Sequence, residues 1–215
     1  MPSHSTLMGM YDAMLAKLGP SRWWPGDTPF EIAIGAILTQ NTNWKNVEKA
    51  LDNIKDAGLL DARSLHELPL PRLAELIRPA GYYNIKAKRI HNFLQFLKDE
   101  AEFNLESLKG GDLADLRPRV LSINGVGPET ADCILLYALD YPVFVVDTYT
   151  ARILGRHGLA WEEIDYHGLQ SIFMDALPDD VALFNEYHAL LVRVGANWCR
   201  KKEGLCDTCP LQPFL

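Results

Sequence analysis

The segment RPRVLSINGVGPETADCILLYAL, residues 117–139, predicts two helices joined by a tight turn. The first helix ends near Ile123, and the second begins with Pro128, because a missing N–H is harmless at the first helical position. Gly125 and Gly127 lie between them and can adopt positive φ with exposed N–H groups, since they have no Cβ. Such a loop at a helix start can hold an anion. An isolated pair of glycines is more often an ordinary corner, so the interpretation depends on the rest of the chain.

The remaining sequence predicts helices almost throughout. Apolar residues recur at helical spacing along most of the 215 residues, and proline and glycine separate these stretches. The segment YPVFVVD, residues 141–147, is a short apolar, β-branched run that could be a strand or a buried extended linker. Because no convincing alternating strands are found, we predict an all-α fold.

Composition sets limits on location and partners. The N-terminal residues do not have the pattern of a signal peptide, and no apolar run approaches the roughly 20 residues that span a bilayer. We therefore expect a cytoplasmic protein with no membrane partner. The net charge of −7 argues weakly against a nucleic-acid partner, although a local basic strip can lie on an acidic protein. Four cysteines without a signal peptide are not expected to form structural disulfides.

The pattern L-x-x-x-G-V-G-x-x-T-A, followed by an apolar helix and VVDT, resembles the helix-hairpin-helix DNA glycosylases of the endonuclease III type. The resemblance extends from about residue 25 to Cys209. It implies two helical domains with a DNA-binding cleft between them. One would be a six-helix barrel at 29–137, with the hairpin at about 114–139, and the other would combine 1–28 with 138–215. The implied partner is double-stranded DNA that contains a damaged base, bound by a monomer.

The same resemblance assigns roles to individual residues. The hairpin residues would hold a DNA phosphate, chiefly through backbone amides: Gly125, Val126, Gly127 and Thr130. GAILTQNT, residues 35–42, is similar to the loop whose glutamine fills the gap left by an extruded nucleotide, here Gln40 beside Asn41. GYYNIKAKRI, residues 81–90, matches a further family segment, and VVDTYTARIL places Asp147 in the catalytic position. An aspartate before a helix is also an ordinary N-cap, and the two roles can coexist.

The residue after the hairpin argues against strand cleavage. In bifunctional family members, the position two residues beyond the second glycine is a lysine that attacks the sugar, whereas this chain has Glu129. A carboxylate cannot form an imine, so the resemblance implies base removal without lyase activity. At a helix start, glutamate instead interacts favourably with the helix dipole by ~0.3–1 kcal/mol. The adenine-mismatch branch has a second acid in the first barrel helix, where this chain has Ala36.

Tryptophans gather near the expected site. Trp23, Trp24 and Pro25 precede the first barrel helix, and Trp44 follows the Gln40 loop. Tryptophan is often part of a core, but these segments resemble the bacterial 3-methyladenine glycosylases, in which aromatic rings sandwich the damaged base. A cationic alkylpurine would be attracted to an indole face and leaves readily. We therefore expect an alkylpurine glycosylase; the alternatives are a glycosylase for another lesion or a non-catalytic lesion-binding module.

The C-terminal cysteines form the pattern C-x6-C-x2-C at Cys199, Cys206 and Cys209. This spacing resembles that of the family's 4Fe-4S cluster, which takes four cysteine thiolates. The fourth would fall at position 215, which is Leu215, while Cys133 is expected to be a small buried apolar residue. The missing fourth cysteine leaves several alternatives: an oxygen, solvent or terminal-carboxylate ligand, a three-iron form, zinc, or a vestigial site. We favour an iron–sulfur cluster with an unusual fourth position.

Basic residues lie between the first two of these cysteines. The simplest interpretation of these residues, Arg200, Lys201 and Lys202, is a solvated surface loop. The family resemblance implies instead that the loop presents their cations to DNA.

Overall fold

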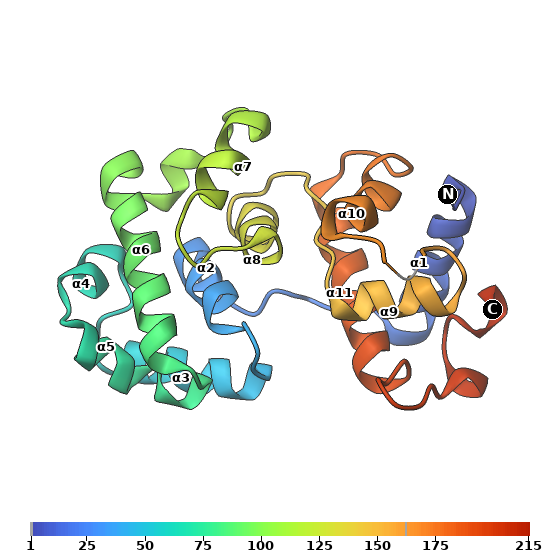
Figure 1. Cartoon of the computed structure of the whole chain (residues 1–215), viewed down its shortest axis with the longest axis horizontal. Coiled ribbons are helices and arrows are strands. Elements are labelled where there is room, and N and C mark those ends of the chain that lie inside the picture. Colours follow the sequence, from blue (N-terminus) through green and yellow to red (C-terminus); the bar gives the residue numbers. More distant parts are fainter. Residues whose placement is uncertain (1, 162) are drawn as a thin grey trace. The chain divides into compact units, whose positions relative to one another are not determined.

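The computed structural model describes residues 2–161 and 163–215, and within them the chain is helical without β-strands, as the sequence predicted. It forms two compact units (Figure 1). One unit is the continuous segment Trp24–Tyr141, and the other combines Met1–Trp23 with Pro142–Leu215. In the described residues, no helix is both long and apolar enough to cross a membrane.

The continuous unit has a buried helix, α2, at its centre. Its α-helices are α2 (Pro29–Leu38), α3 (Trp44–Asp56), α4 (Ala62–Glu67), α5 (Leu70–Leu76), α6 (Tyr83–Ala101), α7 (Leu113–Leu121) and α8 (Pro128–Cys133). Helices α3, α6 and α8 contact α2 directly. The α8 helix continues into a π-helical turn, Ile134–Ala138. Thr28 caps α2 by accepting a hydrogen bond from the Glu31 N–H, and Pro29 occupies its first turn. Seven of the ten α2 residues are buried, so this helix forms the centre of the core.

A buried lysine closes the far end of α2. The ammonium of Lys86 in α6 donates to the carbonyl oxygens of Leu38 at 2.8 Å and Ala80 at 2.7 Å. Its side chain thus satisfies acceptors at the negative end of the helix dipole. Burial, together with the nearby Arg89 charge, lowers the pKa of Lys86 to about 8. This lysine therefore joins α2, α6 and the turn between α5 and α6.

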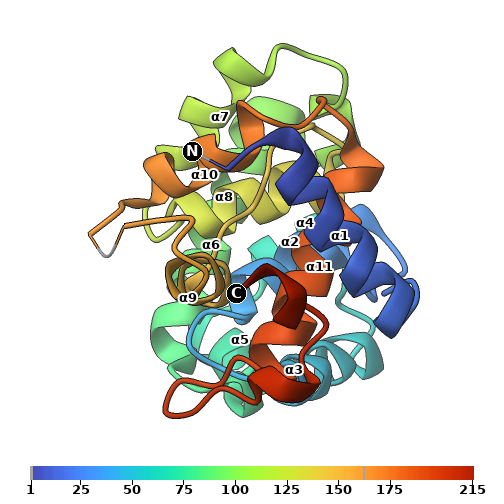
Figure 2. The ribbon, with the colours of Figure 1, turned by 90° about the vertical axis from the view of Figure 1, so that its right-hand side faces the viewer.

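The discontinuous unit joins the first helix to the last long one. It contains α1 (His4–Leu18), α9 (Thr148–Arg156), α10 (Tyr166–Met174) and α11 (Val181–Asn197). Helix α1 packs against α11 (Figure 2), and the buried Tyr187 hydroxyl donates to the Leu7 carbonyl at 2.8 Å. Arg193 donates to the carbonyls of Leu18 and Gly19. These bonds fix the end of α1 to a segment far along the chain.

The apolar run at 141–147 is extended and belongs to no strand, which favours the linker interpretation. The side chains from Val143 to Val146 are buried. Phe144 stacks on Phe173 with centroids 3.9 Å apart and meets Phe184 edge to face. Burial on both sides of the chain therefore explains the strand-like composition, and the segment leads directly into α9.

Candidate functional site

The turn between α7 and α8 has the predicted hairpin geometry at one glycine but not at both. Gly125 has φ 94°, a conformation that side chains disfavour. Gly127 has φ −89° and is the N-cap of α8, and Pro128 starts the helix immediately after it. Gly127 therefore does not adopt the positive φ that the sequence allowed. The Val126 N–H donates to the Ile123 carbonyl at 3.0 Å and closes the turn.

These bonds determine which amides can bind an anion. Val126 is buried and its N–H is committed to the turn, so it does not offer the outward amide that the sequence led us to expect. Within the described residues, no acceptor is found for the N–H groups of Gly125 and Gly127. Both lie next to the N-terminus of α8, where the backbone favours negative charge.

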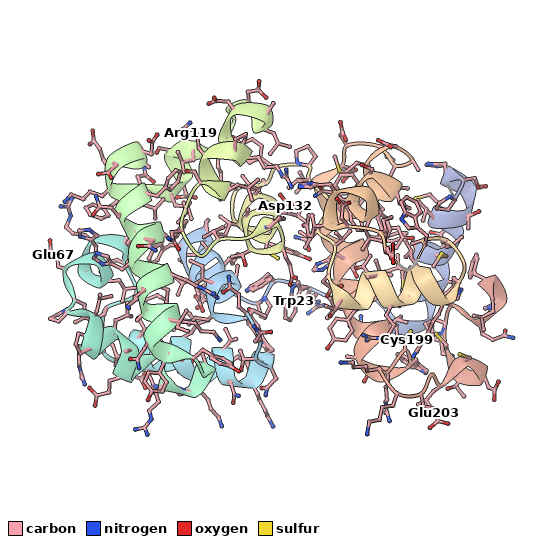
Figure 3. All side chains as sticks on the ribbon, in the orientation of Figure 1. Trp23, Glu67, Arg119, Asp132, Cys199 and Glu203 are labelled. Atoms are coloured by element: carbon pink, nitrogen blue, oxygen red, sulfur yellow. The ribbon has the colours of Figure 1, made fainter. Side chains whose placement is uncertain are left out.

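A buried ion pair holds the two hairpin helices together. Arg117 of α7 donates to both carboxylate oxygens of Asp132 in α8, at 2.7 and 3.0 Å. The Asp132 side chain, which is labelled in Figure 3, is fully buried. The Arg117 side chain is 20% exposed. The bidentate geometry fixes the angle between the helices on either side of the glycine turn.

Gln40 is bound to the hairpin from the loop after α2. Its side-chain amide donates to the Thr130 hydroxyl at 2.8 Å and to the Gly125 carbonyl at 3.3 Å. Arg89 of α6 donates to the Gln40 carbonyl oxygen, and the Arg89 stem lies so close to Gly125 that a Cβ there would overlap with it. Thr130 is buried, so its side chain supports Gln40 instead of facing solvent. Asn41 is exposed, with φ 54°.

Sequence reasoning missed Arg89 and a groove beside the hairpin. The groove is lined by Lys88, Arg89, Asn92, Asn124 and Gly125, among others. Lysine and arginine on successive positions of an amphipathic helix were visible in the sequence, but only the fold shows that they lie beside the glycine turn.

Three aromatic rings form a cluster in the continuous unit. Trp24 meets Trp44 edge to face, with centroids 5.2 Å apart and planes at 90°, and it also contacts Tyr137 at 5.2 Å. A parallel slot for a base is therefore not formed between Trp24 and Trp44, contrary to the expected sandwich. Gly35 makes room for Trp24, since a Cβ there would lie 3.2 Å from the indole nitrogen.

The other two residues of the expected base pocket differ in exposure. Trp23, at the end of the N-terminal segment of the discontinuous unit, is half-buried, whereas Pro25 is exposed. Tyr137 was not predicted, because its position on the π-helical turn after α8 brings it to Trp24 only in the fold.

Asp147 caps α9 and keeps one oxygen away from the cap. Its Oδ1 accepts hydrogen bonds from the N–H of Thr150 at 2.7 Å and from the Thr150 hydroxyl at 2.9 Å. The side chain is 11% exposed, and Oδ2 lies 4.0 Å from Nε2 of His188 on α11. The expected capping role is thus present, and the second oxygen is available for another task.

The two positions that distinguish branches of the resemblance are well defined. Glu129 is exposed in the first turn of α8, where a carboxylate is favourable at the helix start. Ala36 is buried within α2 and carries no acid.

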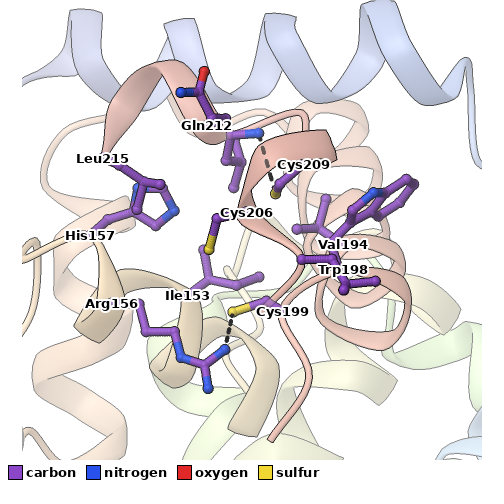
Figure 4. Close-up of a pocket in the computed structure, with 12 residues that line it drawn as sticks. Ile153, Arg156, His157, Val194, Trp198, Cys199, Cys206, Cys209, Gln212 and Leu215 are labelled. Atoms are coloured by element: carbon purple, nitrogen blue, oxygen red, sulfur yellow. Dashed lines mark hydrogen bonds between the residues drawn. The ribbon is translucent and has the colours of Figure 1, made fainter. Parts of the chain in front are cut away.

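The three C-terminal cysteines line one cavity in the discontinuous unit (Figure 4). Arg156 donates to the Cys199 sulfur at 3.3 Å, and the Leu211 N–H donates to the Cys209 sulfur at 3.5 Å. Burial raises the pKa of the Cys209 thiol, and the nearby Cys199 and Cys206 act in the same direction. Leu215 contributes to the wall of the same cavity.

The donor set at this cavity fits an iron–sulfur cluster only in part. Thiols are the ligands that such clusters use, and N–H donors to sulfur are also present. However, across the described residues no three His, Cys, Asp or Glu side chains converge on one metal position. Cys133 is buried in α8 of the other unit, as expected for a small apolar residue, and does not line the cavity.

The basic loop between these cysteines faces solvent. Arg200, Lys201 and Lys202 are all exposed, in a short loop closed by an antiparallel bridge between Cys199 and Gly204. Their charges are therefore accessible to an anionic partner.

Comparison with known proteins gives a consistent assignment. Residues 34–179 match the model of the HhH-GPD superfamily of base excision DNA repair proteins. A Methanocaldococcus jannaschii protein that carries the name "Putative DNA repair glycosylase" is 47% identical over 206 residues, covering 95% of this chain and 93% of the relative.

Two solved structures extend the comparison. The structure of H. pylori 3-methyladenine DNA glycosylase bound to 1,N6-ethenoadenine has a TM-score of 0.77 and 28% identity, covering 91% of this chain and 98% of that one. A trapped endonuclease III–DNA covalent intermediate has a TM-score of 0.84 at 21% identity, covering 100% and 96%, and shows the shared fold. The chain therefore belongs to the HhH-GPD superfamily of base excision DNA repair glycosylases, with an endonuclease III-like fold.

Proposed function

We propose that the protein is a monofunctional DNA glycosylase that removes an alkylated purine, similar to 3-methyladenine, from double-stranded DNA. Two observations together carry this proposal: Asp147 caps α9 and is partly exposed, and Glu129 stands at the position of the lyase amine. The first supplies charge for base release, and the second offers no nucleophile for strand cleavage.

DNA would be held through its phosphates. The N–H groups of Gly125 and Gly127 at the start of α8 suit one phosphate oxygen, and the adjacent groove adds the cations Lys88 and Arg89. The exposed loop with Lys201 and Lys202 supplies further sequence-independent attraction. These local features offset the overall acidity of the chain.

Base release requires stabilisation of a cationic sugar. Removing a charged base leaves an oxocarbenium-like sugar, and a fixed carboxylate stabilises it because the charge is already oriented before reaction. Oδ1 of Asp147 is held by Thr150, so the carboxylate cannot rotate freely and Oδ2 keeps a defined direction. Water then adds at the sugar carbon, with Asp147 as its proton acceptor.

The lesion assignment is supported by the aromatic cluster and by the H. pylori relative. In this proposal a flipped base would stack on the ring of Trp44, which the edge-to-face contact with Trp24 holds in place. A cationic purine gains from contact with that face. The 28% identity to a 3-methyladenine glycosylase favours the same class of substrate.

The position two residues beyond Gly127, where bifunctional relatives have the lyase amine, is Glu129 in this chain. Lys86 is in the same unit, but its ammonium is buried and bound to two carbonyl oxygens. We also propose that the three cysteines hold an iron–sulfur cluster, for which the thiol set and the N–H donors are the support. A cluster at this place would order the basic loop.

The test is a set of duplexes that each carry one defined lesion. We expect abasic sites at the alkylpurine, strand breaks only after alkali, and no covalent adduct after borohydride. Asp147→Asn keeps the capping oxygen and should bind lesion duplex while excision falls by orders of magnitude. Asp180→Asn is the matched control, because Asp180 caps α11 by accepting from the Leu183 N–H. Equal rates for parent and Asp147→Asn would overturn the catalytic role, and a trapped adduct would overturn the monofunctional assignment.

A further inference from the structure

His188 is a neighbour of Asp147, the proposed catalytic carboxylate, and the family assignment does not explain its role. His188 lies on α11, which packs against α9, and its Nε2 is 4.0 Å from Oδ2 of Asp147. The His188 side chain is 6% exposed. The two oxygens of Asp147 therefore face different partners: Thr150 binds Oδ1, and the imidazole stands against Oδ2.

Asp147 is a charged group that faces His188, and the basic side chains described on the packed helices bind other partners. From α9, Arg152 donates to the carbonyls of Cys199 and Gly195, and Arg156 donates to the Cys199 sulfur. From α1, Lys17 donates to the Thr208 carbonyl.

On α11 itself, the ionisable neighbours are also directed elsewhere. Glu186 accepts from Ser21, and Arg193 binds the end of α1. Tyr187 donates to Leu7, and Tyr11 of α1 packs against its ring. Each of these three α11 side chains is thus bound to a partner other than His188.

Burial decides the charge state of the ring. It lowers the pKa of His188 below the ordinary range, and the carboxylate of Asp147 acts in the opposite direction. At neutral pH the ring is neutral, so it forms no ion pair with Oδ2 of Asp147. A protonated ring would form an ion pair with Oδ2 and compete with the reacting sugar for the same charge.

We propose that His188 is a positioning residue for Asp147: its neutral ring packs beside Oδ2 and leaves the carboxylate free to act on the sugar, and its protonation switches base excision off. The inference rests on the proposed glycosylase chemistry at Asp147. The proposal predicts how excision depends on pH. Excision needs the neutral ring, so activity is lost as the pH falls through the titration of His188.

The first test is the pH dependence of single-turnover excision, between about pH 5 and pH 8, where histidines titrate. The substrate is a duplex with a permanently cationic 7-methylguanine, so that the leaving base itself needs no proton. We expect the parent rate to fall about tenfold per pH unit on the acid side, with a midpoint below about 6.5. In His188→Gln, which cannot become a cation, this fall should move to lower pH, so that the variant exceeds the parent at the acid end.

The matched control is His167→Gln, which changes an exposed histidine on α10 of the same unit and should reproduce the parent profile. The inference would be overturned if the excision rates of the parent and of His188→Gln fell in the same way as the pH is lowered.

A second measurement does not depend on excision. The His188 ring signal is followed by NMR during a pH titration of the parent and of Asp147→Asn. We expect a lower midpoint in Asp147→Asn, because the carboxylate favours the imidazolium. An unchanged midpoint would overturn the inference, even if His188→Gln failed to fold. A shifted midpoint without excision of any lesion would instead support the pair and overturn the proposed function.

Discussion

The ion pair inside the hairpin makes an asymmetric prediction about stability. Asp132 is fully buried, while the Arg117 side chain keeps 20% of its surface exposed. Arg117→Met leaves a buried carboxylate without its cation, and breaking a buried pair in this way costs about 3–5 kcal/mol. Asp132→Asn leaves an arginine that can reach water with part of its side chain, so we expect a smaller loss of about 1–3 kcal/mol.

The double variant Arg117→Met with Asp132→Leu separates charge burial from packing. It removes both charges, and replacement of a buried pair by apolar residues is often neutral or stabilising. We therefore expect the double variant to be more stable than Arg117→Met alone. Arg119→Met is the control, because Arg119 pairs on the surface with Glu100 and Asp115, and exposed pairs contribute about 0–1 kcal/mol.

The assay is equilibrium unfolding in urea at neutral pH. The dependence of the free energy of unfolding on urea concentration must have the same slope in all variants, so that their free energies are comparable. The reasoning is refuted if Arg117→Met loses no more than Arg119→Met. It is also refuted if Asp132→Asn is more destabilising than Arg117→Met, because the order of the two losses follows directly from their burial.

Three further outcomes follow from the described contacts. The folded-state pKa of Lys86, about 8, is below its ordinary 10.5, so the unfolded chain binds the proton more tightly. Urea unfolding should therefore show the parent gaining stability over Lys86→Met between about pH 8 and 10, and parallel curves would contradict this. Gly125→Ala should lower the melting temperature and duplex affinity, because a Cβ there overlaps with an arginine stem at φ 94°, whereas Gly127→Ala, with open space at φ −89°, should keep the melting temperature of the parent. Lys201→Glu with Lys202→Glu should weaken binding to any duplex and flatten its salt dependence, measured by fluorescence anisotropy; an unchanged slope would exclude the loop from DNA contact.

The parts of the site that sequence analysis predicted are those set by neighbouring residues. The turn at Gly125, the start of α8 at Pro128 and the cap at Asp147 each depend on a few consecutive positions. The same local patterns carried the family resemblance, which the comparisons confirmed.

The features that sequence analysis missed are contacts between distant segments. Arg89 reaches Gln40 across 49 positions, and His188 reaches Asp147 only because α11 packs on α9. The edge-to-face contact of Trp24 with Trp44 depends on ring rotation, which no spacing encodes. Residue types alone therefore identified the candidates but not their partners.

The bond between Tyr187 and Leu7 has a consequence for biosynthesis. The two residues are 180 positions apart, and a ribosome adds about 5–20 residues per second. Helix α11 is therefore completed about 10–40 s after α1. During this time Leu7, Met10 and Met14 lack the contacts that bury them in the finished protein. Trp24–Tyr141 is continuous and can fold during this interval. Closure of the discontinuous unit is therefore a late event, and the apolar face of α1 stays uncovered until α11 has been made.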